Sequence, residues 1–240
     1  MENPSTSDNA WDQPLTDLRH HPYARTWPQL SNQLIAMRWP VDDLKRVQTS
    51  YAFSIELFAN LVRANEVPFL SHTVGTASIL ALHGAPATIV CGGLLHAAYT
   101  HGKYATAPNA ALDRNWRLAV ARHTTPEIEL LVRNYRRYRP ADIPVPADAG
   151  GYDQDRAAVL LVRAANHLEE HLDCGLIYAN KVQTQGVEVM QHARVLLPAL
   201  GYNRLLADLE AAERLMGDMR PVPADAVSPE TQTRSVAQRG

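Results

Sequence analysis

Two histidines, His72 and His96, are the residues of this chain whose type and spacing most directly suggest chemistry. An imidazole takes up or releases a proton near neutral pH and binds metal ions through a ring nitrogen. Taken singly, each is also what one expects of a hydrogen-bonded core histidine or a surface histidine. The prediction of a shared site therefore depends on the helices that position the two side chains.

Residues 68–104 are predicted to supply these helices. Ser71 is a candidate N-cap for a first helix that ends near Gly84. A second helix is expected to begin at Pro86, which is favoured in a first turn, and to run to about Tyr99. The second helix is apolar nearly all round, which predicts that it is buried on every side and forms the centre of the fold.

Gly92 and Gly93 lie in this central helix, one turn before His96. Each glycine costs about 1 kcal/mol relative to alanine in a helix interior. We therefore expect a packing reason for the pair, and space beside the histidine is one such reason.

The order of these features resembles the HD superfamily of metal-dependent phosphohydrolases. The resemblance is carried by Ser71-His72, an apolar helix, Gly84-Ala85-Pro86, an apolar run and Leu94-Leu95-His96, and it covers about residues 41–175. In layout the chain is most similar to the hydrolase domain of RelA/SpoT-type alarmone enzymes. The resemblance implies a single HD-domain-like helical bundle that holds a divalent metal, usually Mn²⁺, through a first His, a His-Asp doublet and a later Asp.

Carried over to this chain, the resemblance makes His72 the first metal ligand, His96 the doublet histidine and Asn166 the counterpart of the later Asp. Ala97 replaces the Asp of the doublet, and Thr100-His101 stand where the alarmone hydrolases carry an acidic pair. The chain therefore departs from the family pattern at every acidic position.

The chain looks closer to a small, poorly characterised HD-like family. In that family the His is followed by Ala or Ser, a hydrophobic residue and Tyr, as in His96-Ala97-Ala98-Tyr99. A later helix of the family carries Ala-Asn-x-x-Glu, as in Ala165 to Glu169. Two imidazoles and an amide oxygen hold a hard divalent cation less well than carboxylates do. Glu169, one turn after Asn166, would restore one negative charge. We expect a divalent metal (Mn, Fe or Zn) that is weakly bound or absent, with His72, His96, Asn166 and Glu169 as its ligands.

Three polar residues that follow the central helix are predicted to be catalytic: Tyr99, His101 and Lys103. They lie where a cleft should open. His101 has a pKa range suited to acid–base work, and Lys103 would neutralise an anionic substrate. The alternative is a polar surface loop.

Two further motifs have simpler explanations. Residues 167–171 match the inverted zinc-protease pattern H-x-x-E-H, but we interpret them as an exposed helix shoulder. Residues 133–139 contain four arginines. Such a run is usually a solvated helix face and less often an anion-binding site.

The remaining pattern predicts an all-α protein. Apolar residues recur at intervals of three and four, and no segment alternates long enough to require a sheet. The predicted helices span residues 41–63, 71–84, 86–99, 124–138, 153–172, 185–200 and 202–216, with one more through Trp116 and Val120. We predict an N-terminal arm over 1–38, one HD-like helical domain over 39–216 and a disordered tail over 217–240.

Composition limits the partners and the location. The formal charge is −2, with a pI near 6.5, so we expect neither nucleic acid nor a membrane as a partner. Cys91 and Cys174 form no disulfide framework, which favours a reducing cytoplasm. No apolar run reaches the roughly 18 residues of a membrane span, and the start of the chain does not resemble a signal peptide.

These observations lead to two hypotheses. In the first, the chain is a divergent HD-like enzyme that acts on a small-molecule substrate by hydrolysis or other acid–base chemistry. In the second, it is a ligand-binding or scaffolding protein with a degenerate HD fold, for which Ala97 and the missing acidic pair are the evidence. The sequence leaves the substrate and the oligomeric state open.

Overall fold

The computed structural model describes residues 23–101, 113–178 and 186–218, and every structural statement below concerns these ranges. The helices are α1 (Trp27–Ala36), α2 (Val41–Phe58), α3 (Phe69–Leu82), α4 (Ala87–Leu95), α5 (Arg114–His123), α6 (Pro126–Arg137), α7 (Gln154–Leu172), α8 (Gly175–Tyr178), α9 (Val187–Ala199) and α10 (Asn203–Asp218), with short 3-10 turns η3 (Pro140–Asp142) and η4 (Ala149–Gly151). The only β-structure within these ranges is one isolated bridge between Val62 and Pro68. The all-α prediction is confirmed.

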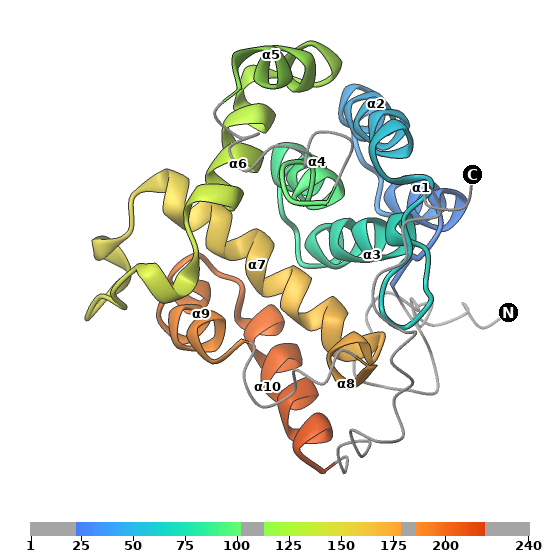
Figure 1. The fold of residues 1–240 in the computed structure, drawn as a ribbon. Coiled ribbons are helices and arrows are strands. Elements are labelled where there is room, and N and C mark those ends of the chain that lie inside the picture. Colours follow the sequence, from blue (N-terminus) through green and yellow to red (C-terminus); the bar gives the residue numbers. More distant parts are fainter. Residues whose placement is uncertain (1–22, 102–112, 179–185, 219–240) are drawn as a thin grey trace, which may run out of the picture.

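Helix α4 is the centre of the bundle, as predicted. It packs against α2, α3, α6 and α7, and Figure 1 shows it enclosed by these helices. Residues 90–95 are all buried. The helix is shorter than expected because regular structure ends at Leu95 and His96 is its C-cap. None of the described helices is long and apolar enough to cross a membrane.

The paired glycines of α4 have a packing role that differs from the predicted one. A Cβ on Gly93 would lie 3.2 Å from the Ala77 Cα of α3 and 2.7 Å from the Leu80 Cδ1. A Cβ on Gly92 would lie 2.4 Å from the Leu131 Cδ2 of α6. The glycines therefore make room for neighbouring helices and not for the imidazole of His96.

Helices α6 and α7 form the other side of the fold. Thr125 caps α6 through its hydroxyl, and Pro126 takes the first helical position. Asp153 caps α7 by accepting a hydrogen bond from the Arg156 N–H at 2.7 Å. The predicted span of α7 is confirmed to within one residue, and α9 and α10 pack against this helix, as Figure 1 shows.

The prediction of an arm over 1–38 is wrong for its described part. Residues 27–36 form α1, and Leu30 and Leu34 are fully buried. Gln33 Nε2 donates to the Ser78 carbonyl of α3 at 3.0 Å. Pro28 is compatible with helix α1 because it lies in its first turn. Residues 1–22 and the tail from 219 onward lie outside the described ranges.

The helix predicted over 41–63 ends at Phe58, five residues early. Residues 59–68 instead form a tight loop, closed by hydrogen bonds from the Phe69 N–H to the Leu61 carbonyl and from the Arg63 N–H to the Val67 carbonyl, each 2.9 Å. Helix α3 starts at Phe69, two residues before the predicted cap, because Pro68 begins it. This loop carries Arg63 onto the first turn of α3.

The close contact at Gly93 yields a stability prediction. Gly93→Ala should lower the free energy of unfolding by about 1–3 kcal/mol, because the new methyl group meets the backbone of α3. Helix propensity alone would make alanine more stabilising than glycine by about 1 kcal/mol. The expected loss of stability is therefore opposite in sign to the effect of helix propensity. Urea unfolding followed by circular dichroism measures the change.

Gly92→Ala is the matched control for this test. The new methyl group meets the end of the Leu131 side chain, which can rotate away. Gly92→Ala should therefore lower the free energy of unfolding by less than Gly93→Ala does. If Gly93→Ala stabilises the protein, the described α3–α4 contact is wrong.

Candidate functional site

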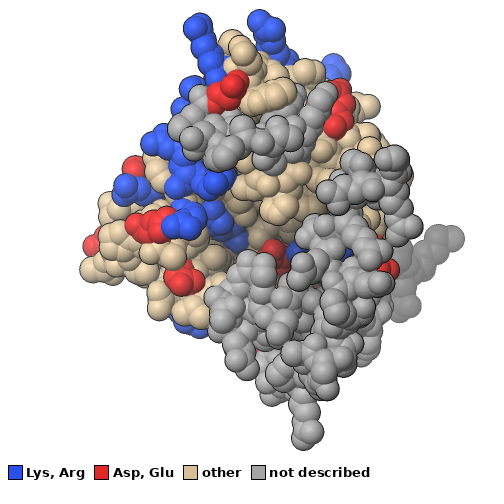
Figure 2. Space-filling model, viewed as in Figure 1, with Lys and Arg blue, Asp and Glu red and all other residues tan. Residues whose placement is uncertain are grey.

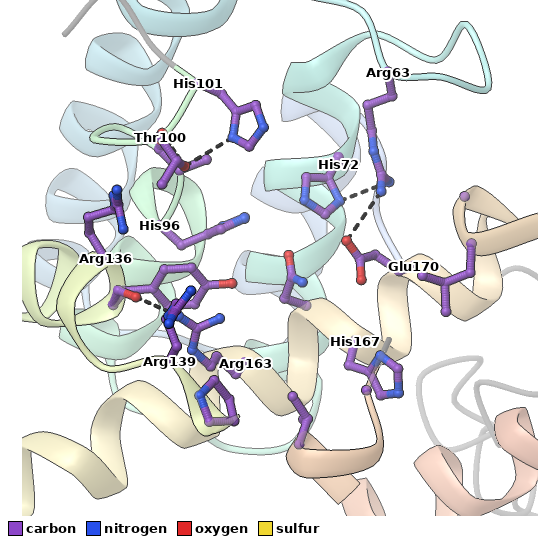
Figure 3. Close-up of a pocket in the computed structure, with 18 of the residues that line it drawn as sticks. Arg63, His72, His96, Thr100, His101, Arg136, Arg139, Arg163, His167 and Glu170 are labelled. Carbon is purple, nitrogen blue, oxygen red and sulfur yellow. Dashed lines mark hydrogen bonds and ion pairs between the residues drawn. The ribbon is translucent and has the colours of Figure 1, made fainter. Parts of the chain in front are cut away.

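A cavity of about 570 Å³ opens between the end of α4, helices α6 and α7, and the loop that precedes α3. Figure 3 shows its polar side chains. Those used below are Arg63, His72, His96, His101, Tyr135, Arg136, Arg139, Arg163, Asn166, His167 and Glu170.

The cavity brings together three of the predicted metal ligands. The ring centroids of His72 and His96 are 5.2 Å apart, with the planes nearly perpendicular, and both residues are buried. The amide of Asn166 lies close enough to His72 to raise the pKa of that histidine. Burial lowers the same pKa by more. The Asn166 Oδ1 is buried and has no hydrogen-bond partner in the described part of the chain.

The backbone fixes the protonation of His96. Its Nδ1 lies 2.8 Å from the Gly93 carbonyl, which can only accept, so the Nδ1 carries the proton. Burial, and then the neighbouring His72, hold the pKa of His96 well below its usual range. The ring is therefore neutral at pH 7, and its Nε2 has a free lone pair. In Figure 3 the ring extends towards His72.

His72 belongs to a buried ionic network. Its Nδ1 forms a short hydrogen bond with Glu169 Oε2, and the Glu169 side chain is fully buried. Arg63 Nη1 lies 3.1 Å from that Nδ1, 3.2 Å from Glu169 Oε2 and 2.6 Å from Asp173 Oδ2. Arg63 Nη2 lies 3.5 Å from Glu170 Oε1. One guanidinium thus faces three carboxylates from the end of α7.

Burial and charge act in opposite directions on this network. Burial raises the pKa of Glu169 to about 7, although Arg63 and Arg25 lower it. Burial, and then Arg63, hold the pKa of His72 well below its usual range. Near neutral pH one proton therefore lies between His72 Nδ1 and Glu169 Oε2. When it is on the histidine, the Nε2 is unprotonated.

The residues present fit a hard divalent cation poorly. Glu169, the anionic ligand that was expected, is held by His72 Nδ1 and Arg63 and is not among the residues that line the cavity. No group of three or more His, Cys, Asp or Glu side chains in the described ranges could hold a metal ion. What remains is two imidazoles and an amide beside a guanidinium. The divalent metal (Mn, Fe or Zn) stays a prediction, and the chemistry below uses the side chains alone.

The three predicted catalytic residues are in different situations. The Tyr99 hydroxyl donates to Glu129 Oε1 at 3.1 Å, away from the cavity, and burial raises its pKa. His101 lines the cavity, with its ring 5.2 Å from that of Phe69. Lys103 lies outside the described residues.

The interpretation of residues 167–171 as an exposed shoulder is wrong. His167 and His171 are both buried, and their Nε2 atoms lie 3.1 Å apart. Gly186, with a φ of 103°, packs on the His167 ring so closely that a Cβ would lie 2.0 Å from it. Burial lowers the pKa of His167 to about 3 and that of His171 to about 4. Helix α9 and Gly186, the residue before it, cover this side of α7.

Sequence reasoning missed several residues of the cavity. Arg63 was assigned to the end of a helix, and Tyr135 was not singled out. Arg163 carried no motif. The basic run of residues 133–139 was the one available signal, and two of its members, Arg136 and Arg139, do line the cavity.

Comparison with known proteins gives no assignment. No family model matches the chain, and no significantly similar protein was found among curated proteins. The HD resemblance therefore stays a prediction that no relative tests.

Because His167 and His171 of α7 are buried, we expect the folded protein to lose stability in acid. The pKa of His171 in the folded protein, about 4, is below the 6.5 of an unperturbed histidine. Its contribution to stability is therefore present above pH 6.5 and is lost as the pH falls towards 4. Between pH 7 and pH 4, wild type should lose up to roughly 3 kcal/mol more than His171→Gln.

Urea unfolding at a series of pH values measures this difference. His123→Gln, at an exposed histidine of α5, is the matched control and should follow wild type. Identical pH profiles for wild type and His171→Gln would show that His171 titrates normally.

Proposed function

We propose that the chain is a small-molecule enzyme with an HD-like fold that performs acid–base chemistry in this cavity. The observation that carries the proposal is the buried pair of His72 and Glu169, joined at His72 Nδ1. Such a pair leaves the histidine Nε2 as the proton acceptor on the cavity side. It also places a carboxylate where it stabilises the imidazolium that forms.

The proposed roles follow from the hydrogen bonds. His72 Nε2 takes a proton from a substrate or from water, and Glu169 compensates the new charge across Nδ1. His96, held neutral by its bond to Gly93, accepts a hydrogen bond at Nε2 and orients the group that loses its proton. Arg63 opposes the protonation of Glu169 and Asp173, which burial favours. Hydrolysis, or another reaction that begins with proton abstraction, is the class that this arrangement serves.

The alternative is a ligand-binding or scaffolding protein without catalysis. Ala97 favours it, because this residue lines the cavity at the position of the doublet Asp and has no acidic group. The two functions differ in one property, since only the enzyme requires the proton-accepting nitrogen of His72.

The proposed partner is a small-molecule substrate, and nucleic acid is not proposed as one. The formal charge of −2 supports this restriction. Cys91 and Cys174 are both free, which supports a reducing compartment, and we propose the cytoplasm.

A substrate screen with matched variants tests the proposed function. Wild type is assayed with panels of phosphate esters, carboxylic esters and amides, and the best substrate is then given to His72→Ala and Glu169→Gln. Both variants should lose at least about 100-fold in kcat, because general-base catalysis contributes that much or more. Glu56→Gln, at an exposed glutamate of α2, should retain full activity.

Catalysis by His72 is contradicted if a turned-over substrate is processed equally well by His72→Ala. Binding without turnover across all three panels favours the non-catalytic alternative.

A further inference from the structure

Arginines dominate the charge of the cavity wall. Four of them line it, Arg63, Arg136, Arg139 and Arg163, against two glutamates. Figure 3 shows the last three on one side, opposite Arg63 and Glu170. Two arginines are already compensated: Arg63 by the carboxylates of α7, and Arg139 by Asp142, which accepts two hydrogen bonds at 2.7 and 2.9 Å.

Arg163 is rigidly held but has no ion pair in the described ranges. Its guanidinium carbon lies 4.1 Å from the centroid of the Tyr135 ring. Its Nη2 donates to the Tyr135 carbonyl at 2.6 Å and its Nε to the Tyr138 carbonyl at 3.2 Å. Two carbonyls orient the group without neutralising it. A mostly buried cation without an ion pair is unfavourable, and Glu170 offsets its charge only at longer range, so its retention calls for a reason.

Tyr135 connects this cation to the histidine pair. Its ring centroid is 5.1 Å from that of His96, on the same cavity wall. Arg163 is close enough to contribute to the lowered pKa of His96. A group held by Arg163 would therefore lie beside the proposed reaction centre.

Arg136 supplies a second cation to the same wall. It lies one residue after Tyr135 near the end of α6, is exposed, and has no ion pair in the described part of the chain. Figure 2 shows basic side chains gathered over this part of the molecule, beside the hollow. A guanidinium binds phosphate and carboxylate oxygens through paired N–H donors.

We infer that Arg163, stacked on Tyr135, and Arg136 form a subsite for an anionic group, a phosphate or a carboxylate, of the small molecule that occupies the cavity. The inference deepens the proposed function because it names the substrate class of the same site. It does not need catalysis, since the subsite binds its anion whether or not His72 accepts a proton. The competing explanation is that Arg163 only caps the carbonyls at the end of α6.

Anion binding to the full chain tests the subsite. Inorganic phosphate and acetate are titrated separately at constant ionic strength, with the thermal midpoint and the ring NMR signals of His96 as readouts. One of the anions should raise the midpoint saturably and shift the His96 signals, and which one does so identifies the group. A helix cap alone would move neither readout.

Three variants complete the test. Arg136→Gln, at an exposed position, should weaken binding about 10-fold, as expected for the loss of one charge-assisted hydrogen bond. Arg163→Gln keeps a donor for one carbonyl but removes the charge, and it should abolish binding. Arg122→Gln, an exposed arginine of α5 outside the cavity, should bind as wild type does.

The subsite is refuted if neither anion affects wild type, or if Arg136→Gln binds like wild type. If the anion binds as expected but His72→Ala retains full turnover, the subsite stands and the proposed catalytic role of His72 fails.

Discussion

The contact of Arg63 with Glu169 and Asp173 is the interaction on which the site depends. The last turns of α7 place three carboxylates close together, and two of their side chains are fully buried. A buried charge left without its partner costs about 3–5 kcal/mol. Arg63 supplies the opposite charge from a separate loop and so limits how far burial raises the pKa values of these carboxylates beside His72. Without it, Glu169 would hold its proton and His72 would lose the acceptor for its Nδ1 hydrogen.

With this arrangement, the proposed acid–base chemistry would not need the acidic positions that the family resemblance implies. The cavity carries Ala97 and Asn166 where the HD pattern has carboxylates, and Arg136 and Arg163 line it without an ion pair in the described ranges. This lining disfavours a hard cation and suits the proposed anionic ligand. The fold sets the protonation of both histidines: His96 donates its Nδ1 hydrogen to the Gly93 carbonyl, and His72 shares one proton with Glu169.

The sequence predicted much of this, because local patterns determine most of it. Helices α4 and α7 follow from apolar periodicity, and the convergence of His72, His96 and Asn166 follows from their placement on adjacent buried helices. Arg63 could not be found in that way. Its partners lie more than 100 residues further along the chain, and an uninterrupted periodic pattern hid the helix end at Phe58. The burial of His167 and His171 was missed for the same reason, since the covering turn at Gly186 is distant in sequence.

The most direct test of the central interaction is an NMR titration of the Glu169 carboxyl carbon in wild type and in Arg63→Met. The account predicts that Glu169 titrates near pH 7 in wild type, because burial raises its pKa while Arg63 restrains the rise. In Arg63→Met the titration should move to higher pH, because the restraint is gone. A Glu169 that titrates near its unperturbed pKa of 4.5, or that is unaffected by the loss of Arg63, would contradict the account.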